Sequence, residues 1–241
     1  MLYLRSALFQ IWFFGATFIA SLLLTLALPL PHRVMALGVA VYARVVLFGL
    51  RVLSGIACEI RGRANIPRAR AIVAAKHQSA WETVAMFTLI ADPVQVLKKE
   101  LVLIPFYGWI ALKLGMIPVD RAARASALKK MIAQAKKRIA DGRVILIFPQ
   151  GTRVAPGQSA EYKPGVAALY TQLGVPCVPV ALNSGVYWPR RALLKRPGKI
   201  IVEFLAPIQP GLKRDEFMAA LEARIEQASN RLVAEALSAN K

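Results

Sequence analysis

The chain of 241 residues has few of the side chains that usually mark a metal site, a disulfide framework or a covalent nucleophile. It contains two histidines and two cysteines, and no histidine–carboxylate cluster that would predict a bound metal. Cys58 and Cys177 lie in apolar surroundings, so we expect two small core residues in a reducing compartment. The chain has no Gly-x-Ser-x-Gly segment, and neither cysteine has a histidine near it in sequence. Neither a covalent intermediate on the protein nor a cofactor is therefore predicted.

Acidic residues are also scarce, with 13 against 32 lysines and arginines and a net charge of +19. The mean hydropathy is nevertheless high, at +0.47. This combination is typical of a protein that sits on an anionic membrane and meets phosphate groups. Nucleic acid binding is the usual alternative, but it favours basic residues gathered with aromatic ones on one face. Here the basic residues are spread along the chain, so no nucleic acid partner is predicted.

Residues 6–31 contain no charged side chain. Because a helix needs about 20 apolar residues to cross the hydrocarbon core, this run predicts a membrane-anchoring helix. A signal peptide is the alternative, but the run is longer than a typical signal core and no clean cleavage site follows.

Residues 35–58 are also apolar, but they carry Arg44 and Arg51 on one helical face. They predict either a second helix with its arginines at headgroup level or an ordinary amphipathic helix of the soluble part. We expect membrane-anchoring helices over residues 1–58 and an α/β domain over residues 59–241.

The second part of the chain alternates short apolar runs with helical patterns, which predicts an α/β domain with a largely buried sheet. Strands are expected at 71–75, 94–98, 116–120, 144–148, 177–182 and 200–205, with a further candidate at 58–62. Helices are expected at 79–90, 107–114, 122–140, 165–173 and 213–238.

A histidine stands directly after the first of the six expected strands. His77 follows "AIVAA", and Ser79 and Glu82 then form a Ser-x-x-Glu pattern, which is typical of a helix capping box. Glu82 can therefore be only a cap, and His77 only a loop residue. In open α/β sheets, however, ligands bind at the loops after the carboxyl ends of strands. A carboxylate one helical turn away can hold such a histidine in one tautomer and make it a better base.

Three further segments combine cations with strand ends. In "FPQGTR", residues 148–153, Gly151 allows a tight turn, Thr152 offers a hydroxyl and Arg153 offers a guanidinium that matches phosphate oxygens. In "LKKELVLIPFYGW", Lys98 and Lys99 precede an apolar stretch, which suits a lipid with a phosphate head. "GMIPVDR" ends in Arg121, beside Asp120. Taken singly, each segment can also be a solvated turn or strand end.

Together these segments resemble the 1-acylglycerol-3-phosphate acyltransferase family. That family has a histidine and an aspartate with four residues between them, a lysine–glutamate block with Ile-Pro-x-x-Gly, then Ile-x-Val-x-Arg, Phe-Pro-Glu-Gly-Thr-Arg and Val-Pro-x-x-Pro-Val. Between residues 76 and 183 the same order occurs as "HQSAWE", "KKELVLIPFYG", "IPVDR", "FPQGTR" and "VPCVPVAL". Five ordered blocks are far more specific than any one of them.

The resemblance implies a single acyltransferase-type α/β domain with a mixed, mostly buried sheet flanked by helices, after an N-terminal helical hairpin at the membrane. It implies transfer of a fatty acyl group from an acyl-CoA or acyl carrier protein thioester to the sn-2 hydroxyl of lysophosphatidic acid, giving phosphatidic acid. His77 would be the general base and Glu82 its orienting partner. The substrate-binding residues would be Lys98, Lys99, Arg121, Gln150, Gly151, Thr152 and Arg153.

Three positions depart from the family pattern. Glu82 stands where aspartate is usual, which keeps the carboxylate on a longer stem. Gln150 stands where glutamate is usual, so a negative charge is lost beside Arg153. Lys76 precedes the histidine, where many members carry asparagine.

The expected location is the membrane, on the cytoplasmic face of the inner membrane, with anionic membrane lipids as partners. Two alternatives remain at this point. One is an acyltransferase of the same superfamily that acts on another lysolipid or an aminolipid. The other is a lipid-binding membrane protein without catalysis, although such a protein has no need of His77.

Overall fold

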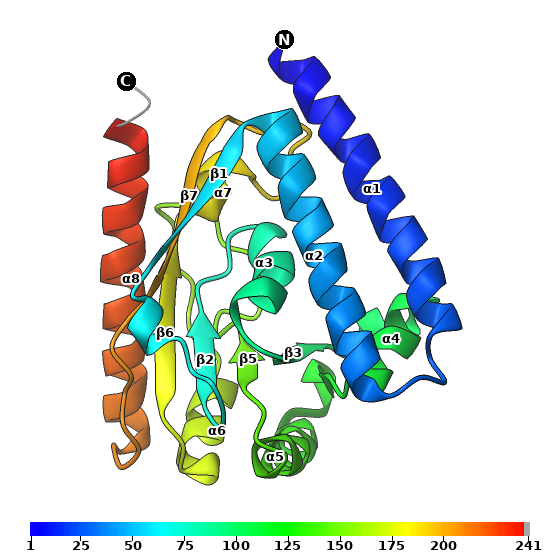
Figure 1. The fold of residues 1–241 in the computed structure, drawn as a ribbon. Coiled ribbons are helices and arrows are strands. Elements are labelled where there is room, and N and C mark those ends of the chain that lie inside the picture. Colours follow the sequence, from blue (N-terminus) through cyan, green and yellow to red (C-terminus); the bar gives the residue numbers. More distant parts are fainter. Residues whose placement is uncertain (239–241) are drawn as a thin grey trace.

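The computed structural model describes residues 1–238 as a helical hairpin packed on an α/β domain (Figure 1). The helices are α1 (Leu2–Leu26), α2 (His32–Ser54), α3 (Trp81–Leu89), α4 (Tyr107–Lys113), α5 (Arg124–Ala140), α6 (Gly165–Leu173), α7 (Ser184–Tyr187) and α8 (Arg214–Ser238). The strands are β1 (Ile56–Arg61), β2 (Ile72–Ala75), β3 (Val94–Lys98), β4 (Ile117–Val119), β5 (Ile145–Ile147), β6 (Cys177–Leu182) and β7 (Gly198–Phe204).

The hairpin consists of α1 and α2, which lie antiparallel, with α1 farther from the sheet (Figure 1). Both helices are long and apolar enough to cross a membrane. They approach closely at Gly49, where an added Cβ would lie 2.1 Å from Nε1 of Trp12. That indole nitrogen donates a hydrogen bond to the carbonyl of Val45 at 3.0 Å. A side chain at position 49 would therefore push the two helices apart.

The seven strands form one mixed sheet in the order β1-β7-β6-β2-β5-β3-β4. All neighbours are parallel except β6 and β7, which are antiparallel. The central strand β2 is parallel to both of its neighbours, β5 and β6. The carboxyl ends of these three strands therefore meet at one edge of the sheet, where ligands bind in open α/β folds.

Both faces of the sheet are covered by helices, which agrees with the apolar character of its strands. On one face, Phe9 of α1, Leu50 of α2 and Trp81 of α3 join the apolar core. On the other face the core is completed by α5, α6 and α8, for example through Met131 and Phe217. The expected fold class is confirmed.

The expected elements recur with small shifts at their ends. Strand β1 begins at Ile56, so the boundary predicted at residue 58 falls inside this strand. The apolar stretch of residues 35–58 is a helix only as far as Ser54. The prediction that both cysteines are core residues is confirmed for Cys177 and wrong for Cys58, because Cys58 is exposed on the edge strand β1.

Candidate active site

His77 lies just beyond β2 and is directed at the start of α3. Its Nδ1 is 2.8 Å from Oε1 of Glu82, and its ring stacks on Phe148 with 4.2 Å between the ring centroids. A carboxylate partner favours a proton on Nδ1, which leaves Nε2 as the ring nitrogen that can accept one. The side chain of His77 is 15% exposed, whereas that of Glu82 is fully buried. The two residues form a histidine–carboxylate pair with only the imidazole accessible.

The Glu82 carboxylate is fully hydrogen-bonded despite its burial. Besides His77, its Oε1 accepts from the backbone N–H groups of Gln78 and Ser79, each at 2.6 Å. Its Oε2 accepts from the hydroxyl of Ser184 at 2.7 Å. The Ser79 hydroxyl oxygen accepts from the N–H of Trp81 at 3.1 Å and not from that of Glu82, so the carboxylate half of the expected capping box is present and the hydroxyl half is shifted by one residue. Glu82 is thus a helix cap and the partner of His77 at the same time.

The segment 148–153 follows β5 and lies beside the His77 loop. The N–H of His77 donates to Oε1 of Gln150 at 3.2 Å, and the N–H of Val154 donates to the carbonyl of His77 at 2.8 Å. Gly151 has a left-handed φ of 67°, which only glycine adopts without strain. These contacts fix the histidine loop to the 148–153 turn.

Arg153 belongs to a cluster of arginines above this turn. Partial burial lowers the pKa of its guanidinium below the ordinary value, and nearby Arg190 lowers that pKa further, while Glu82 acts in the opposite direction. Nη1 of Arg190 donates to the carbonyl of Arg153 at 3.3 Å. Two guanidinium groups held close together favour a bound anion, because an anion relieves their mutual repulsion.

The residues expected to bind substrate divide into two groups. Lys98, Arg121, Gly151, Thr152 and Arg153 line a common cavity together with His77. Lys99 and Gln150 do not line it. Lys99 forms an ion pair with Asp120, which raises the pKa of the lysine and lowers that of the aspartate. Gln150 is buried and contacts the His77 backbone.

The cavity that contains His77 has a volume of about 960 Å³. Its cationic lining includes Lys163 and Arg190 besides the residues already named. Apolar side chains of β5, α5 and α6 form the rest of the lining: Ile147, Leu128, Met131 and Val166. The apolar segment 103–109 lies instead on the outer surface, where Leu103 is 76% exposed. The cavity thus combines a base, several cations and an apolar wall.

Comparison with known proteins places this arrangement in a family. A family model described as Acyltransferase matches residues 57–183. A protein of Pseudomonas aeruginosa named 1-acyl-sn-glycerol-3-phosphate acyltransferase is 36% identical over 201 residues, which cover 83% of this chain and 78% of the relative. The chain belongs to the 1-acyl-sn-glycerol-3-phosphate acyltransferase family.

More distant members agree in sequence and in fold. A Limnanthes alba protein of the same name is 30% identical over 192 residues, covering 78% of this chain and 67% of the relative. The crystal structure of the 1-acyl-sn-glycerophosphate acyltransferase from Thermotoga maritima superposes with a TM-score of 0.78 at 22% identity, over 96% of this chain and 98% of that one. The shared fold includes both N-terminal helices, since the superposition covers nearly the whole acyltransferase.

Within the acyltransferase, the position of Lys76 explains how this residue is tolerated beside His77. The Lys76 side chain is 2% exposed, and its Nζ donates to both carboxylate oxygens of Glu226 on α8, at 2.7 and 2.6 Å. The hydroxyl of Tyr162 donates to Oε1 of Glu226 at 2.8 Å. A buried charge is tolerated only when it is paired in this way. The ion pair also ties the His77 loop to α8.

Two contacts of the acyltransferase site were missed by sequence reasoning. Ser184 binds Glu82, and the neighbouring N–H of Gly185 donates to Oε1 of Gln78 at 3.0 Å. Both residues follow β6, the parallel neighbour of β2. The polar pair "NS" directly after the expected strand 177–182 was a usable signal, but the adjacency of the two strands was not known from the sequence.

Proposed function

We propose that the protein transfers a fatty acyl group from an acyl thioester to the sn-2 hydroxyl of 1-acylglycerol-3-phosphate, giving phosphatidic acid. The observation that carries this proposal is the His77–Glu82 pair, 2.8 Å apart, at a cavity lined by cations and by apolar side chains. The names of the relatives support the same acceptor.

The chemistry needs only the side chains of the pair. Nε2 of His77 takes the proton of the acceptor hydroxyl as the hydroxyl oxygen attacks the thioester carbonyl. The tetrahedral intermediate then collapses, the carbon–sulfur bond breaks, and His77 returns the proton to the thiolate. Glu82 holds the imidazole by Nδ1 and stabilises the imidazolium that forms between the two steps. The products are the ester and the free thiol.

The lining of the cavity supports binding of the acceptor's phosphate in one region and of its acyl chain in another. Arg153 and Arg121 offer forked donors to the acceptor phosphate, and Lys98 offers a further charge. The apolar side chains of α5 offer a surface for a fatty acyl chain. A polar head beside the base and an apolar tail beyond it are what a lysophospholipid requires.

The direct test is acyl transfer by the purified full-length protein. It is offered acyl-CoA or acyl carrier protein thioesters together with lysophosphatidate, other lysophospholipids and aminolipids, and the products are identified by mass spectrometry. We expect phosphatidic acid to be the main product. A main product from another acceptor would overturn the assignment of the acceptor, and no acyl transfer with any pair would overturn the catalytic role.

Arg153→Ala is expected to raise the KM for lysophosphatidate by about 10-fold or more, because a charged hydrogen bond contributes roughly 1.5–3 kcal/mol. The KM for the acyl donor should change much less. Arg153→Lys should recover only part of the loss, since lysine lacks the fork. Steady-state kinetics with each substrate varied provide the measurement, and Arg196→Ala, an exposed arginine outside the cavity, is the control. An effect confined to the donor would reassign Arg153 to the donor's phosphates.

The hairpin supports membrane attachment through a single leaflet, on the cytoplasmic side where acyl thioesters are made. The inner face of α2 is buried against the α/β domain from Met35 to Leu50. A hairpin that crossed the bilayer would draw the charged domain into the hydrocarbon, at a high free-energy cost. Lying in the interface, α1 and the outer face of α2 can bury apolar side chains while the domain stays in water.

Phe14 and Phe18, which are 62% and 68% exposed on α1, should be part of the membrane contact. The double variant Phe14→Asp/Phe18→Asp is expected to leave the membrane pellet far more readily than the parent, because apolar burial in the membrane is lost while both side chains are largely exposed in the fold. The parent should resist extraction by high salt, since salt does not screen apolar burial. Sedimentation after salt washing provides the measurement. Leu237→Asp, at an exposed position of α8, is the control, and equal release of both variants would contradict the anchor.

A further inference from the structure

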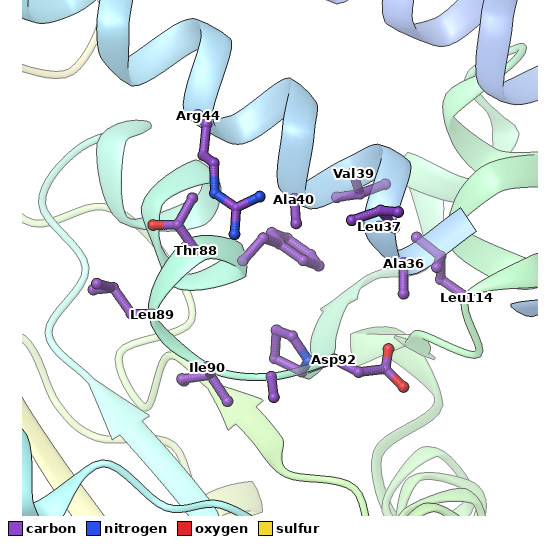
Figure 2. Close-up of a pocket in the computed structure, with 13 residues that line it drawn as sticks. Ala36, Leu37, Val39, Ala40, Arg44, Thr88, Leu89, Ile90, Asp92 and Leu114 are labelled. Carbon is purple, nitrogen blue, oxygen red and sulfur yellow. The ribbon is translucent and has the colours of Figure 1, made fainter. Parts of the chain in front are cut away.

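A second cavity lies between α2 and α3 (Figure 2), and neither His77 nor Glu82 lines it. Its volume is about 410 Å³, and we call it the α2–α3 pocket. Its walls come from residues 36–44 of α2 and from residues 87–93, which include the end of α3. It shares no lining residue with the catalytic cavity. His77 pairs with the first turn of α3, whereas this pocket is at the last turn, so the two sites are separate.

One cation of the described residues, Arg44, lines the pocket, and residues 1–238 offer it no counter-ion. Arg44 extends from α2 toward Thr88, with its guanidinium directed into the space between the two helices (Figure 2). Among residues 1–238, no hydrogen bond or ion pair involves its side chain. In Figure 2, Ala40 and Leu37 extend the wall from Arg44 along α2. Arg44 is exposed at one end of the pocket, and an arginine with five unpaired donors in that position is suited to bind an anion.

The single acidic residue of the pocket lining is already neutralised. Asp92 lies on the side of the pocket opposite Arg44 (Figure 2). Its Oδ1 accepts from Nη2 of Arg143 at 2.8 Å, and its Oδ2 is 2.8 Å from Nε2 of His32. Asp92 therefore neither pairs with Arg44 nor repels an anion bound there.

The pocket is continuous with the apolar surface that is proposed to meet the membrane. Leu37 lines the pocket and is 61% exposed. Val41 and Val45 flank Arg44 on the outer side of α2 and are also exposed. A cation in such a surface is costly in lipid unless a phosphate group accompanies it. The ligand that offers a phosphate and an acyl chain at one place is a membrane phospholipid.

We propose that the α2–α3 pocket binds one anionic membrane phospholipid, with its phosphate on Arg44 and an acyl chain along Leu37 and Ala40. This site is additional to the substrate site at His77 and does not depend on the reaction catalysed there. We expect the pocket to select lipids with a net negative headgroup. Among the described residues that line it, Arg44 is the only charged side chain without a partner.

The test is lipid binding to the full-length protein in neutral detergent micelles, measured by native mass spectrometry. Dioleoylphosphatidylglycerol and dioleoylphosphatidylcholine are titrated separately. We expect one tightly bound phosphatidylglycerol on the parent, weakened at least about tenfold by Arg44→Gln, since the contact is a charged hydrogen bond. Ala40→Phe, which fills the pocket and keeps the charge, should weaken it as well. Inorganic phosphate alone should not compete.

The matched control is Arg51→Gln. Arg51 lies seven residues further along α2 on the same helical side, and it does not line the pocket. Equal effects of Arg44→Gln and Arg51→Gln would mean general attraction of charge and would overturn the proposal. Phosphatidylglycerol binding that is unchanged in Ala40→Phe would also overturn it, and so would displacement of the lipid by inorganic phosphate. Loss of the bound lipid in Arg153→Ala but not in Arg44→Gln would place the lipid in the catalytic cavity instead.

Discussion

Replacing His77 by alanine is expected to abolish measurable acyl transfer, a loss in kcat of about 10³-fold or more. The imidazole serves both steps of the proposed reaction, and general acid–base catalysis by one group contributes about 10²–10⁴-fold. The KM for lysophosphatidate should change little, because the phosphate contacts remain. The chain should stay folded, since Glu82 keeps its three other hydrogen-bond donors. Initial rates and a thermal melt on the same preparation provide the measurement.

The chain contains a natural control for this experiment in its other histidine. His32, at the start of α2, is hydrogen-bonded to Asp92 and lines no part of the catalytic cavity. His32→Ala should keep nearly the parental rate, because Asp92 retains its ion pair with Arg143. Turnover by His77→Ala near that of His32→Ala would remove His77 from the mechanism.

The strands were predictable because their apolar runs are short and bounded by polar residues or glycine. The expected limits of 94–98 and 177–182 are those of β3 and β6. The first residues of β1 and β7 were not predictable, because backbone pairing between these two strands determines where each of them begins. Ile56 is in register with Gly198, so β1 starts two residues before Cys58 and β7 starts two residues before Ile200. Such pairing joins residues that are far apart in sequence and leaves no local pattern.

The site was predictable to the extent that its residues follow strands. Spacing placed Glu82 within reach of His77, and the glycine turn placed Arg153 after a strand, but the roles of these residues were implied only by the resemblance to the family. The different roles of Lys98 and Lys99 could not be foreseen, because they depend on the approach of Asp120 to one of two adjacent lysines. Gln150 was expected at the substrate, yet its side chain accepts from the His77 backbone. A glutamate at this position could accept the same bond, which explains why the departure leaves the loop intact.

Replacing Glu82 by glutamine separates the two roles that this residue combines. Glutamine is nearly isosteric, and its Oε1 can still accept from His77, Gln78 and Ser79. Its amide can donate to Ser184, whose hydroxyl turns to accept. Since loss of a whole cap costs only about 0.5–2 kcal/mol, we expect a small change in stability. Glutamine is also an accepted residue of the capping box.

The charge that faces the imidazolium is nevertheless lost in Glu82→Gln, and kcat is expected to fall by roughly 10²-fold or more. Neutralising the carboxylate of a comparable triad lowers kcat by about 10⁴-fold. Ser184→Ala is the matched variant, because it removes one neutral hydrogen bond to Glu82 and keeps the charge. The kcat of Ser184→Ala should fall only about 2- to 10-fold, because a neutral hydrogen bond contributes a net 0.5–1.5 kcal/mol. Glu82→Asp should keep measurable activity, since aspartate retains the charge on a shorter stem. If Glu82→Gln turns over as fast as Ser184→Ala, the carboxylate charge has no part in catalysis and Glu82 acts only as a cap.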